Sequence, residues 1–298
     1  MNITLVIPIY NRLDITKEGL TSIDNAIKYY QSNGQGRFVL RMVIVDDGST
    51  DGSSKWIKEN FQSVIILQGS GNLWWSGSVN VGARYAIETL GTDYVVLWND
   101  DTKCAEDFFL VLENLLLSDK QYQDAILVSK VYWQHKPNFL FNFGCYFNHS
   151  TGKKTLIGLN KEDNYNEIIP VDWSGGMGTI IPAHILLTVN YFDNEKFPQY
   201  HGDSDFFLRA KESGFKAYAI PDLKIYNNID STGINSVKNL RELKALLTSI
   251  KSFENIKQNF YFNLRHANSV ISWFNFSSHY LLIIGKLLLN RFRGILKS

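Results

Sequence analysis

The sequence has few cysteines, no strong charge of either sign and no long apolar run. Cys104 and Cys145 are too few for a disulfide framework or a zinc site, and they fit a reducing cytosol. The formal net charge is +1, so no overall field favours nucleic acid, which we do not expect as a partner. No apolar run reaches the roughly 18–20 residues of a membrane-spanning helix. The first residues lack a basic stretch followed by an apolar one, so we expect no signal peptide and a cytoplasmic location.

Two glycine-rich phosphate-binding motifs are also absent. No G-x-G-x-x-G follows the first apolar run, and no G-x-x-x-x-G-K-[ST] occurs anywhere. This argues against a conventional dinucleotide site and against a P-loop. Polar and acidic residues stand instead at the ends of the predicted strands.

The order of apolar segments predicts an α/β fold. The 298 residues are 45% hydrophobic and 20% charged, which suits one large α/β domain or two intimate lobes. Short apolar runs alternate with segments of helical spacing, which predicts βαβ units and a mostly parallel sheet. Predicted strands cover residues 3–9, 38–45, 64–67, 94–98, 125–132, 218–220 and 223–226, and predicted helices cover 14–30, 53–60, 79–90, 108–117 and 183–190. We expect a loop over 69–77, a hairpin with loops over 135–166, and helices from about residue 235 onward.

The run 94–98 ends in Asn99-Asp100-Asp101. Open α/β sheets bind ligands at the lip where such strands end. Two adjacent acids there predict a divalent cation, Mn²⁺ or Mg²⁺, held against a nucleotide diphosphate, with Asp101 as the preferred direct ligand. The alternative is that these residues cap the helix that follows.

Two further strand ends carry polar residues. Asp46 and Asp47 follow the second predicted strand, and Pro8, Tyr10 and Asn11 lie at the end of the first. A carboxylate there can accept from a base or a ribose hydroxyl, whereas the alternative is simple turn chemistry. Co-location of the three strand ends predicts a nucleotide pocket.

A second acidic cluster, His201-Gly202-Asp203-Ser204-Asp205, comes about one hundred residues later. An acid that does not bind metal can deprotonate an attacking hydroxyl, and Asp203 is the candidate for this role. The alternative is a helix start, with Asp203 or Ser204 as the N-cap.

Five segments in this order, VIPIYNR, VDDGSTDGS, LWNDDT, GGMGT and HGDSDFFLRA, resemble the inverting family 2 glycosyltransferases with the GT-A fold, over roughly the first 230 residues. The loop of residues 72–82 is similar to the N-x-G-F-x-G-G-x-N-x-G segment of rhamnosyltransferase-like members. The resemblance implies a Rossmann-like, mostly parallel sheet flanked by helices. We therefore expect a GT-A domain over residues 1–232, with a nucleotide-binding half (1–102) and an acceptor half (103–232), followed by a C-terminal helical region (233–298).

The resemblance and the residue patterns together predict a set of site residues. Nucleotide contacts are assigned to Pro8, Tyr10, Asn11, Asp46, Asp47, Asn72, Asn80 and Asp100, the metal to Asp101, and the base to Asp203. Contacts to the donor sugar or acceptor are assigned to Trp74, Trp75, Trp173, Gly175, Gly176, His201 and Asp205. The implied reaction is a single displacement with inversion, from dTDP-rhamnose or a UDP-hexose to a saccharide acceptor, in surface polysaccharide synthesis.

The sequence also departs from the family pattern. Asn99 stands for the first acid of the D-x-D motif, Gly202 for the acid before the base, Val79 for a frequent arginine and Trp74 for a glycine. The late metal-binding histidine of many members has no histidine match. These departures leave open a second reading, a non-catalytic nucleotide-sugar- or carbohydrate-binding relative. A sugar nucleotidyltransferase is disfavoured, because residues 6–11 form no glycine-rich, arginine-containing loop.

The C-terminal region is basic. Glu254 is its last acidic residue, and the basic residues after it are Lys257, Arg265, Lys286, Arg291, Arg293 and Lys297. With the leucines between them, they resemble an amphipathic helix that lies on the inner face of an anionic membrane, which fits a lipid-linked acceptor. The alternative is a helix packed on the domain or in an oligomer interface.

Overall fold

A mixed ten-stranded sheet forms the centre of the molecule. The computed structural model describes residues 1–228 and 239–295, with residues 286–295 as backbone only. The strands of this sheet are β1 (Asn2–Ile9), β2 (Val39–Asp46), β3 (Ile65–Gln68), β4 (Tyr94–Leu97), β5 (Lys103–Cys104), β6 (Ile126–Trp133), β7 (Lys136–Asn142), β10 (Ile169–Pro170), β11 (Thr179–Pro182) and β12 (Ala217–Asn227). Their order is β10-β12-β6-β11-β4-β1-β2-β3, with β5 beside β12 and β7 beside β6. A separate hairpin pairs β8 (Cys145–Asn148) with β9 (Lys153–Leu156).

The sheet is mostly parallel at its centre, which confirms the predicted fold class. β1 pairs in parallel with β2 and β4, β2 with β3, and β6 with β12. Among the strands from β12 to β3 in this order, β11 alone runs the other way, between β4 and β6. Its reversed direction places the residues before β11 next to the end of β4.

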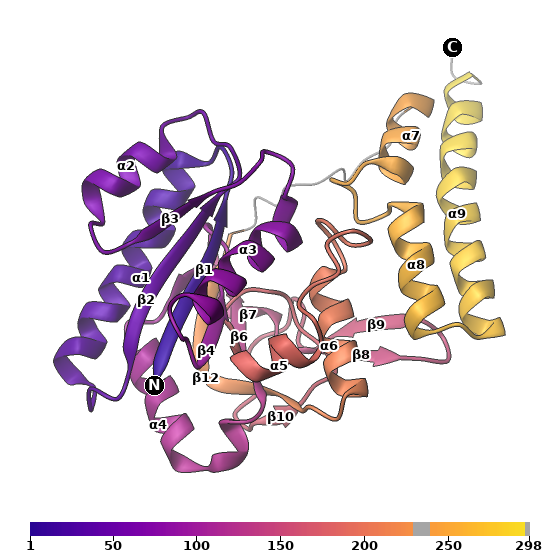
Figure 1. Cartoon of the computed structure of the whole chain (residues 1–298). Helices are drawn as coiled ribbons and strands as arrows, with labels where there is room; N and C mark the ends of the chain where they lie inside the picture. The colour runs from indigo at the N-terminus through magenta and orange to yellow at the C-terminus, as the bar shows by residue number, and fades with distance from the viewer. Residues whose placement is uncertain (229–238, 296–298) are drawn as a thin grey trace.

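Helices cover both faces of the sheet. The helices of the described residues are α1 (Leu13–Asn33), α2 (Ser53–Asn60), α3 (Trp74–Glu88), α4 (Phe108–Ser118), α5 (Ala183–Thr188), α6 (Gly202–Glu212), α7 (Leu240–Thr248), α8 (Ile256–His266) and α9 (Val270–Ile295), with a 3₁₀ turn at Lys120–Tyr122. α1, α2 and α4 pack on one face, and α3, α5 and α6 on the other (Figure 1). Side chains of a strand alternate between these two cores: Ile3, Leu5 and Ile7 belong to the first, and Val6 belongs to the second. Burial on both faces is the reason that the central strands are continuously apolar.

Two predicted boundaries were wrong. α3 begins at Trp74, within the segment 69–77 that we expected to be a loop. No local residue caps this helix; instead Asp47, far away in sequence, accepts hydrogen bonds from the backbone N–H groups of Leu73 and Trp74. The two short strands expected over 218–226 form one strand, β12, whose pairing with β6 is irregular between Ile220 and Lys224.

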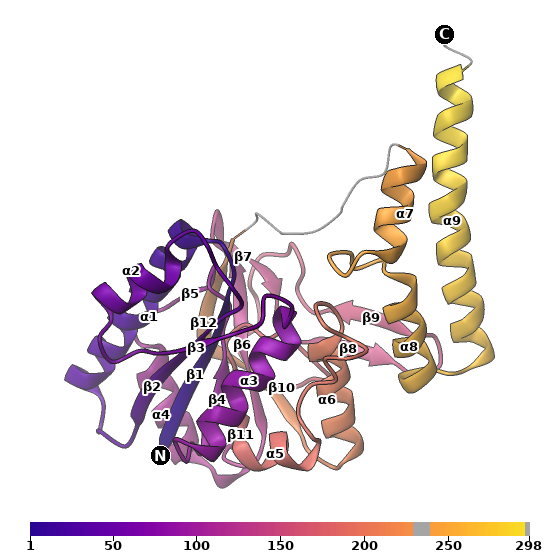
Figure 2. The ribbon, with the colours of Figure 1, turned by 45° about the horizontal axis from the view of Figure 1, so that its top comes forward.

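The C-terminal helices stand beside the main body as a separate group (Figure 2). α8 packs against α6 and against α9. No helix in the described part of the chain is long and apolar enough to cross a bilayer. The start of the helical region at about residue 235, the boundary at 232, the side chains of Lys286, Arg291 and Arg293, and the whole of Lys297 lie outside the described residues.

Candidate active site

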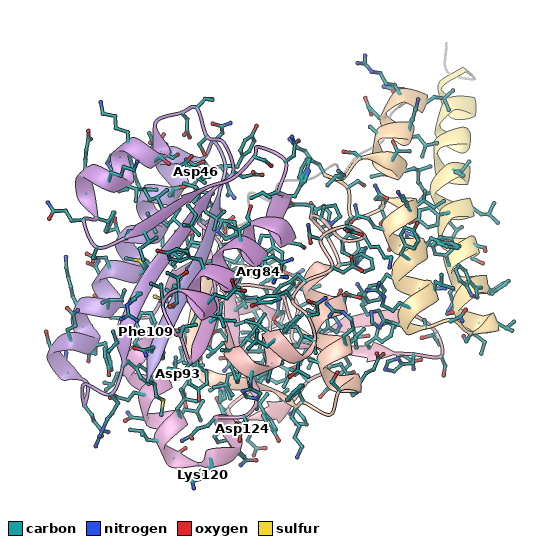
Figure 3. The ribbon with its side chains drawn as sticks, viewed as in Figure 1. Asp46, Arg84, Asp93, Phe109, Lys120 and Asp124 are labelled. Carbon is teal, nitrogen blue, oxygen red and sulfur yellow. The ribbon has the colours of Figure 1, made fainter. Side chains whose placement is uncertain are left out.

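The predicted site residues lie at one edge of the sheet, the one at which the parallel strands β1, β2 and β4 end and the antiparallel strand β11 begins. Ile9 pairs with Asp46 in β1 and β2, so the residues that follow both strands emerge together. Figure 3 shows Asp46 at this edge and Asp93, which precedes β4, at the opposite edge. Because β11 is antiparallel, Thr179 pairs with Leu97 and the glycine-rich residues 175–178 return to the edge where β4 ends.

The loop after β1 is fastened to the loop after β2. Asn11, at φ +49°, donates its backbone N–H to Ser49 Oγ at 3.0 Å, and its Oδ1 accepts from the N–H of Thr50 at 2.7 Å. Pro8 is half-buried, whereas 51% of Tyr10 is exposed. Asn11 is exposed as well, but its Oδ1 already accepts from Thr50, so the side chain of Tyr10 is open to a ligand.

Asp46 and Asp47 are both buried and both organise loops. Asp46 Oδ1 accepts from the N–H of Ser49 at 2.7 Å, and its other oxygen accepts from the hydroxyl of Ser54. Asp47 Oδ1 accepts from the N–H of Gly71 at 2.7 Å, while its Oδ2 takes the two N–H groups that open α3. These carboxylates shape the predicted nucleotide pocket, and Asn72 lies exposed on the loop that Asp47 holds.

Arg12 bridges the two acids that follow β4. Its Nη1 donates to Asp100 Oδ1 and its Nη2 to Asp101 Oδ2, each at 2.9 Å. Thr16 donates to the second oxygen of Asp100 at 3.2 Å. Burial raises the pKa of Asp100 to about 6, and the charge of Arg12 opposes this rise. Asp100, for which we predicted a nucleotide contact, is therefore buried, and both of its carboxylate oxygens accept hydrogen bonds within the protein.

One oxygen at this turn fits a cation. Asp101 Oδ1 is buried and has no hydrogen-bond partner in the described structure. Asn99 is not equivalent, because its Oδ1 accepts from the indole N–H of Trp75 at 3.0 Å. Among the described residues, no group of three or more His, Cys, Asp or Glu side chains could hold a metal ion. A divalent ion here would thus take Asp101 together with water and phosphate oxygens, a ligand set typical of Mg²⁺.

Gly19 allows α1 to approach this turn closely. A Cβ at residue 19 would lie 2.2 Å from the backbone oxygen of Asp100. We expect Gly19→Ala to lower the free energy of unfolding by about 1–3 kcal/mol, because the helix or the turn must move. Urea unfolding measures this change. Asn25→Ala, at an exposed position of the same helix, is the control and should be neutral or slightly stabilising. Equal stability of Gly19→Ala and the wild type would contradict this packing.

A line of contacts leads from residues 99–102 after β4, the Asn99 turn, to the second acidic cluster. Trp75 binds Asn99 and packs its ring over Gly176, where an added Cβ would lie 2.1 Å from the indole. The neighbouring Gly175 faces Asp203: a Cβ on it would lie 3.7 Å from Asp203 Oδ2. Gly176 therefore permits an approach of Trp75 that a larger residue would block, whereas a Cβ at Gly175 would make only an ordinary contact with Asp203.

Asp203 lies in the first turn of α6 and is half-buried. His201, at φ +67°, turns the chain into this helix. Asp203 Oδ1 accepts from the N–H of Ser204 at 2.7 Å, while Oδ2 is the oxygen on the side of Gly175. Burial raises the pKa of Asp203, and the nearby charge of Lys154 opposes this rise.

The predicted acceptor contacts at Asp205 and His201 do not agree with the structure. Asp205 is fully buried and accepts from Arg209, Arg265 and His266, so its carboxylate cannot reach an acceptor. His201 is also buried, beneath the rings of Phe253 and Phe262. The reason in each case is the C-terminal helix α8, which covers this part of α6.

Asn80 needs a similar correction. Its amide donates to the carbonyl of Phe192 at 2.8 Å and to Asn194, and its Oδ1 accepts from the N–H of Phe192 at 3.0 Å. The side chain thus holds the segment 192–194 against α3 and is not directed to a nucleotide.

Two of the predicted tryptophans differ in their surroundings. Trp173 is buried, and its indole N–H has no partner among the described residues. Trp74 is half-buried at φ +58°, a backbone conformation that favours glycine. A glycine at residue 74 would adopt this conformation without strain.

Sequence reasoning missed two cations, Arg12 and Lys154. Arg12 directly follows Asn11, so its place at the edge shared with Asp100 and Asp101 was available as a signal. Lys154, in β9, lies among His201, Ser204 and Phe262, and nothing in the local sequence indicates this.

The sequence pattern described as Glycosyl transferase family 2 matches residues 4–162. The chain belongs to glycosyltransferase family 2. The matched range contains the loops after β1 and β2 and the Asn99 turn, whereas Asp203 lies beyond it. A curated relative, the low-salt glycan biosynthesis hexosyltransferase Agl10 of Haloferax volcanii, is 27% identical over 182 residues, which are 58% of this chain and 54% of that protein. This family 2 member thus spans about half the length of the curated relative it matches.

Solved structures share the fold of this family 2 chain. GalNAc-T7 with UDP, GalNAc and Mn²⁺ matches with a TM-score of 0.56 and 12% identity, over 92% of this chain and 56% of that one. TarS of S. aureus in complex with UDP gives 0.51 and 16%, over 77% and 61%. The mannosyltransferase PcManGT of Pyrobaculum calidifontis, with GDP-Man and Mn²⁺, gives 0.51 and 14%, over 93% and 68%. At these identities the likeness shows the fold alone.

Proposed function

We propose that this chain transfers a hexosyl group from a nucleotide-diphosphate sugar to a saccharide acceptor, with inversion and with Asp203 as the base. The observation that carries this proposal is the continuous line of contacts from Asn99 through Trp75 and the two glycines to Asp203. It joins the acids at the end of β4 to a half-buried carboxylate on another element. Such an arrangement suits a leaving group on one side and a nucleophile on the other.

In this mechanism Asp203 takes the proton from the acceptor hydroxyl as that oxygen attacks the anomeric carbon. The raised pKa of Asp203 makes its carboxylate a stronger base than an exposed one. The absence of a side chain at Gly175 leaves space beside Asp203 Oδ2 for the sugar. The loop after β1 and the loop held by Asp47 would enclose the nucleotide, with Tyr10 and Asn72 as exposed contacts.

Asp101 is the residue that would hold Mn²⁺ or Mg²⁺. A divalent ion there would neutralise charge on the departing nucleotide diphosphate. Arg12 holds the Asp101 carboxylate in place through Oδ2 and leaves Oδ1 for the ion. Its positive charge also offsets one of the two acids, so we expect the ion to bind mainly together with the nucleotide.

Asp101→Asn is expected to weaken Mn²⁺-dependent binding of a nucleotide diphosphate by at least about tenfold, because the open carboxylate oxygen becomes neutral. Calorimetry with Mn²⁺ and with EDTA measures the effect, and in EDTA the variant should bind like the wild type. Asp107→Asn, an exposed acid nearby, is the matched control. Equal affinity of Asp101→Asn and the wild type in Mn²⁺ would refute the assignment.

For the donor, we propose dTDP-rhamnose or a UDP-hexose. The likeness of residues 72–82 to the rhamnosyltransferase-like segment supports the former, and hexosyl transfer is also what the name of Agl10 says of that relative. Purified protein is incubated with dTDP-, UDP- and GDP-sugars with and without Mn²⁺, and nucleotide release is measured. Nuclear magnetic resonance of the product gives its anomeric configuration. Tight binding of a nucleotide sugar without any release, even by slow hydrolysis, would favour the non-catalytic relative.

We also propose that residues 1–232 form the transferase domain, with a nucleotide half (1–102) and an acceptor half (103–232), and that 233–298 form a helical region that lies on a membrane at its cytoplasmic face. α9 supports membrane contact, because Val270, Phe274, Leu281 and Leu282 are between 64% and 87% exposed. A lipid-linked acceptor in surface polysaccharide synthesis would then be within reach. Sedimentation with anionic vesicles, compared with neutral ones, tests this; sedimentation with neither would contradict it.

A further inference from the structure

Lys154 lies beside the residue that we propose as the base. It comes from β9, in the hairpin that packs near the start of α6. Its Nζ is 2.7 Å from His201 Nδ1 and donates to Ser204 Oγ at 2.9 Å. His201 and Ser204 flank Asp203 in the sequence, so Lys154 holds both ends of the short turn that carries this carboxylate.

Aromatic rings enclose the Lys154 ammonium. Its Nζ lies 3.6 Å from the centroid of Phe262 and 5.2 Å from that of Trp173. Phe253 lies at 6.0 Å. The faces of these rings attract a cation, and they keep water away from it. Phe262 and Phe253 belong to the C-terminal helical region, which therefore completes the surroundings of the proposed base.

Near Lys154, one acid has several partners, whereas the lysine has no ion-pair partner. Asp205 is already balanced by Arg209, Arg265 and His266. Lys154 itself forms no ion pair within 4.0 Å in the described part of the chain, and the acidic groups that act most strongly on its charge are Asp203, Cys145 and Asp205. Burial lowers the pKa of Lys154 to about 7, and these acidic groups oppose that decrease. A half-buried lysine enclosed by aromatic rings and without a paired acid is unfavourable for stability, which points to a role in the site.

We propose that Lys154 is a positioning residue for Asp203: its charge keeps the carboxylate ionised, and its two hydrogen bonds fix the turn from His201 to Ser204. This inference rests on the proposed function, in which Asp203 is the base. The other cations of α6 and α8 whose ion pairs are described are engaged elsewhere: Arg209 and Arg265 bind Asp205, and Lys211 binds Asp172. Burial, together with the charge of Lys154, holds the pKa of His201 well below its ordinary value.

Lys154→Gln keeps a hydrogen-bond donor and removes the charge, whereas Lys154→Arg keeps the charge. We measure kcat and KM for the donor across pH 5–9. Without the cation, the acidic limb of the kcat profile should move to higher pH by about 1–3 units, since a nearby opposite charge lowers a carboxyl pKa by that amount. The KM for the donor should stay within about twofold, and Lys154→Arg should retain the wild-type limb.

A purely structural lysine would lower kcat by the same factor at every pH. If folded Lys154→Gln has the acidic limb of its kcat profile at the same pH as the wild type, the inference is overturned. Should that variant not fold, Lys154→Met removes the same charge from a side chain of similar length. The pH of the acidic limb of its kcat profile then decides the question in the same way. Failure of the base assignment is distinguishable, because Asp203→Asn would then retain turnover; an inactive Asp203→Asn with an unmoved limb in Lys154→Gln rejects only the role of Lys154.

Discussion

Asp203→Asn is expected to lower kcat for sugar transfer by roughly 10²–10⁴-fold, with nucleotide binding nearly unchanged. Asparagine has the same shape and can still accept the hydrogen bond from the N–H of Ser204, so the turn into α6 should persist. What it cannot do is accept a proton from an acceptor hydroxyl. The measurement is kcat with a saturating donor, together with calorimetric binding of the nucleotide diphosphate.

The control for this variant is Glu212→Gln, which makes the same chemical change on the same helix at a side chain that is 56% exposed. It should retain kcat within about twofold. Near-native turnover by Asp203→Asn would contradict the assignment of Asp203 as the base. Loss of nucleotide binding in parallel with activity would instead indicate that Asp203 supports the fold of the pocket.

Asp205→Ala is expected to reduce the free energy of unfolding by about 3–5 kcal/mol, the largest stability effect that we predict. The Asp205 carboxylate is fully buried and accepts from Arg265 at 2.6 Å, Arg209 at 2.8 Å and His266 at 2.9 Å. Removing it leaves the two guanidinium groups and the His266 ring without their common partner inside the protein. Arg265 also binds Asp193 at 2.7 Å, so the network joins α6 and α8 to the segment before α6.

Urea unfolding of Asp205→Ala and of Asp24→Ala separates this effect from simple loss of an acid. Asp24 pairs with Lys28 on the exposed side of α1, and its removal should cost less than about 1 kcal/mol. A loss below 1 kcal/mol for Asp205→Ala would contradict the structural role of the network.

The pH dependence of this stabilisation follows from the pKa of Asp205. Burial would raise this pKa, but the hydrogen bond from His266 and the charges of Arg209 and Arg265 lower it below its ordinary value. As the pH falls, the unfolded chain therefore binds a proton at this residue before the folded chain does. The stabilisation is complete above the ordinary carboxyl pKa of about 4 and is lost on further acidification.

The predictions that held depend on local patterns. Alternating apolar runs and helical spacing located the strands and helices of the parallel half, because side-chain periodicity is a property of neighbouring residues. The prediction for α3 failed because the residue that caps it, Asp47, is distant in the sequence. Asn80, His201 and Asp205 lie differently from the prediction for a similar reason. Asn80 binds residues 112 and 114 positions away, and two of the three partners of Asp205 lie 60 and 61 positions away. His201 is covered by the Phe262 ring of α8.

The sequence by itself determined the fold class, the family and the acids that stand at the ends of β2 and β4, since each is written in a contiguous segment. Only the tertiary structure decided that Asp203 lies beside the glycine loop while Asp205 is fully buried. Residues two apart on a helix point to different sides. One side of α6 meets the glycine loop before β11, and the other meets the cations of α8. The packing of these elements leaves Asp203 beside the glycines and encloses Asp205 completely.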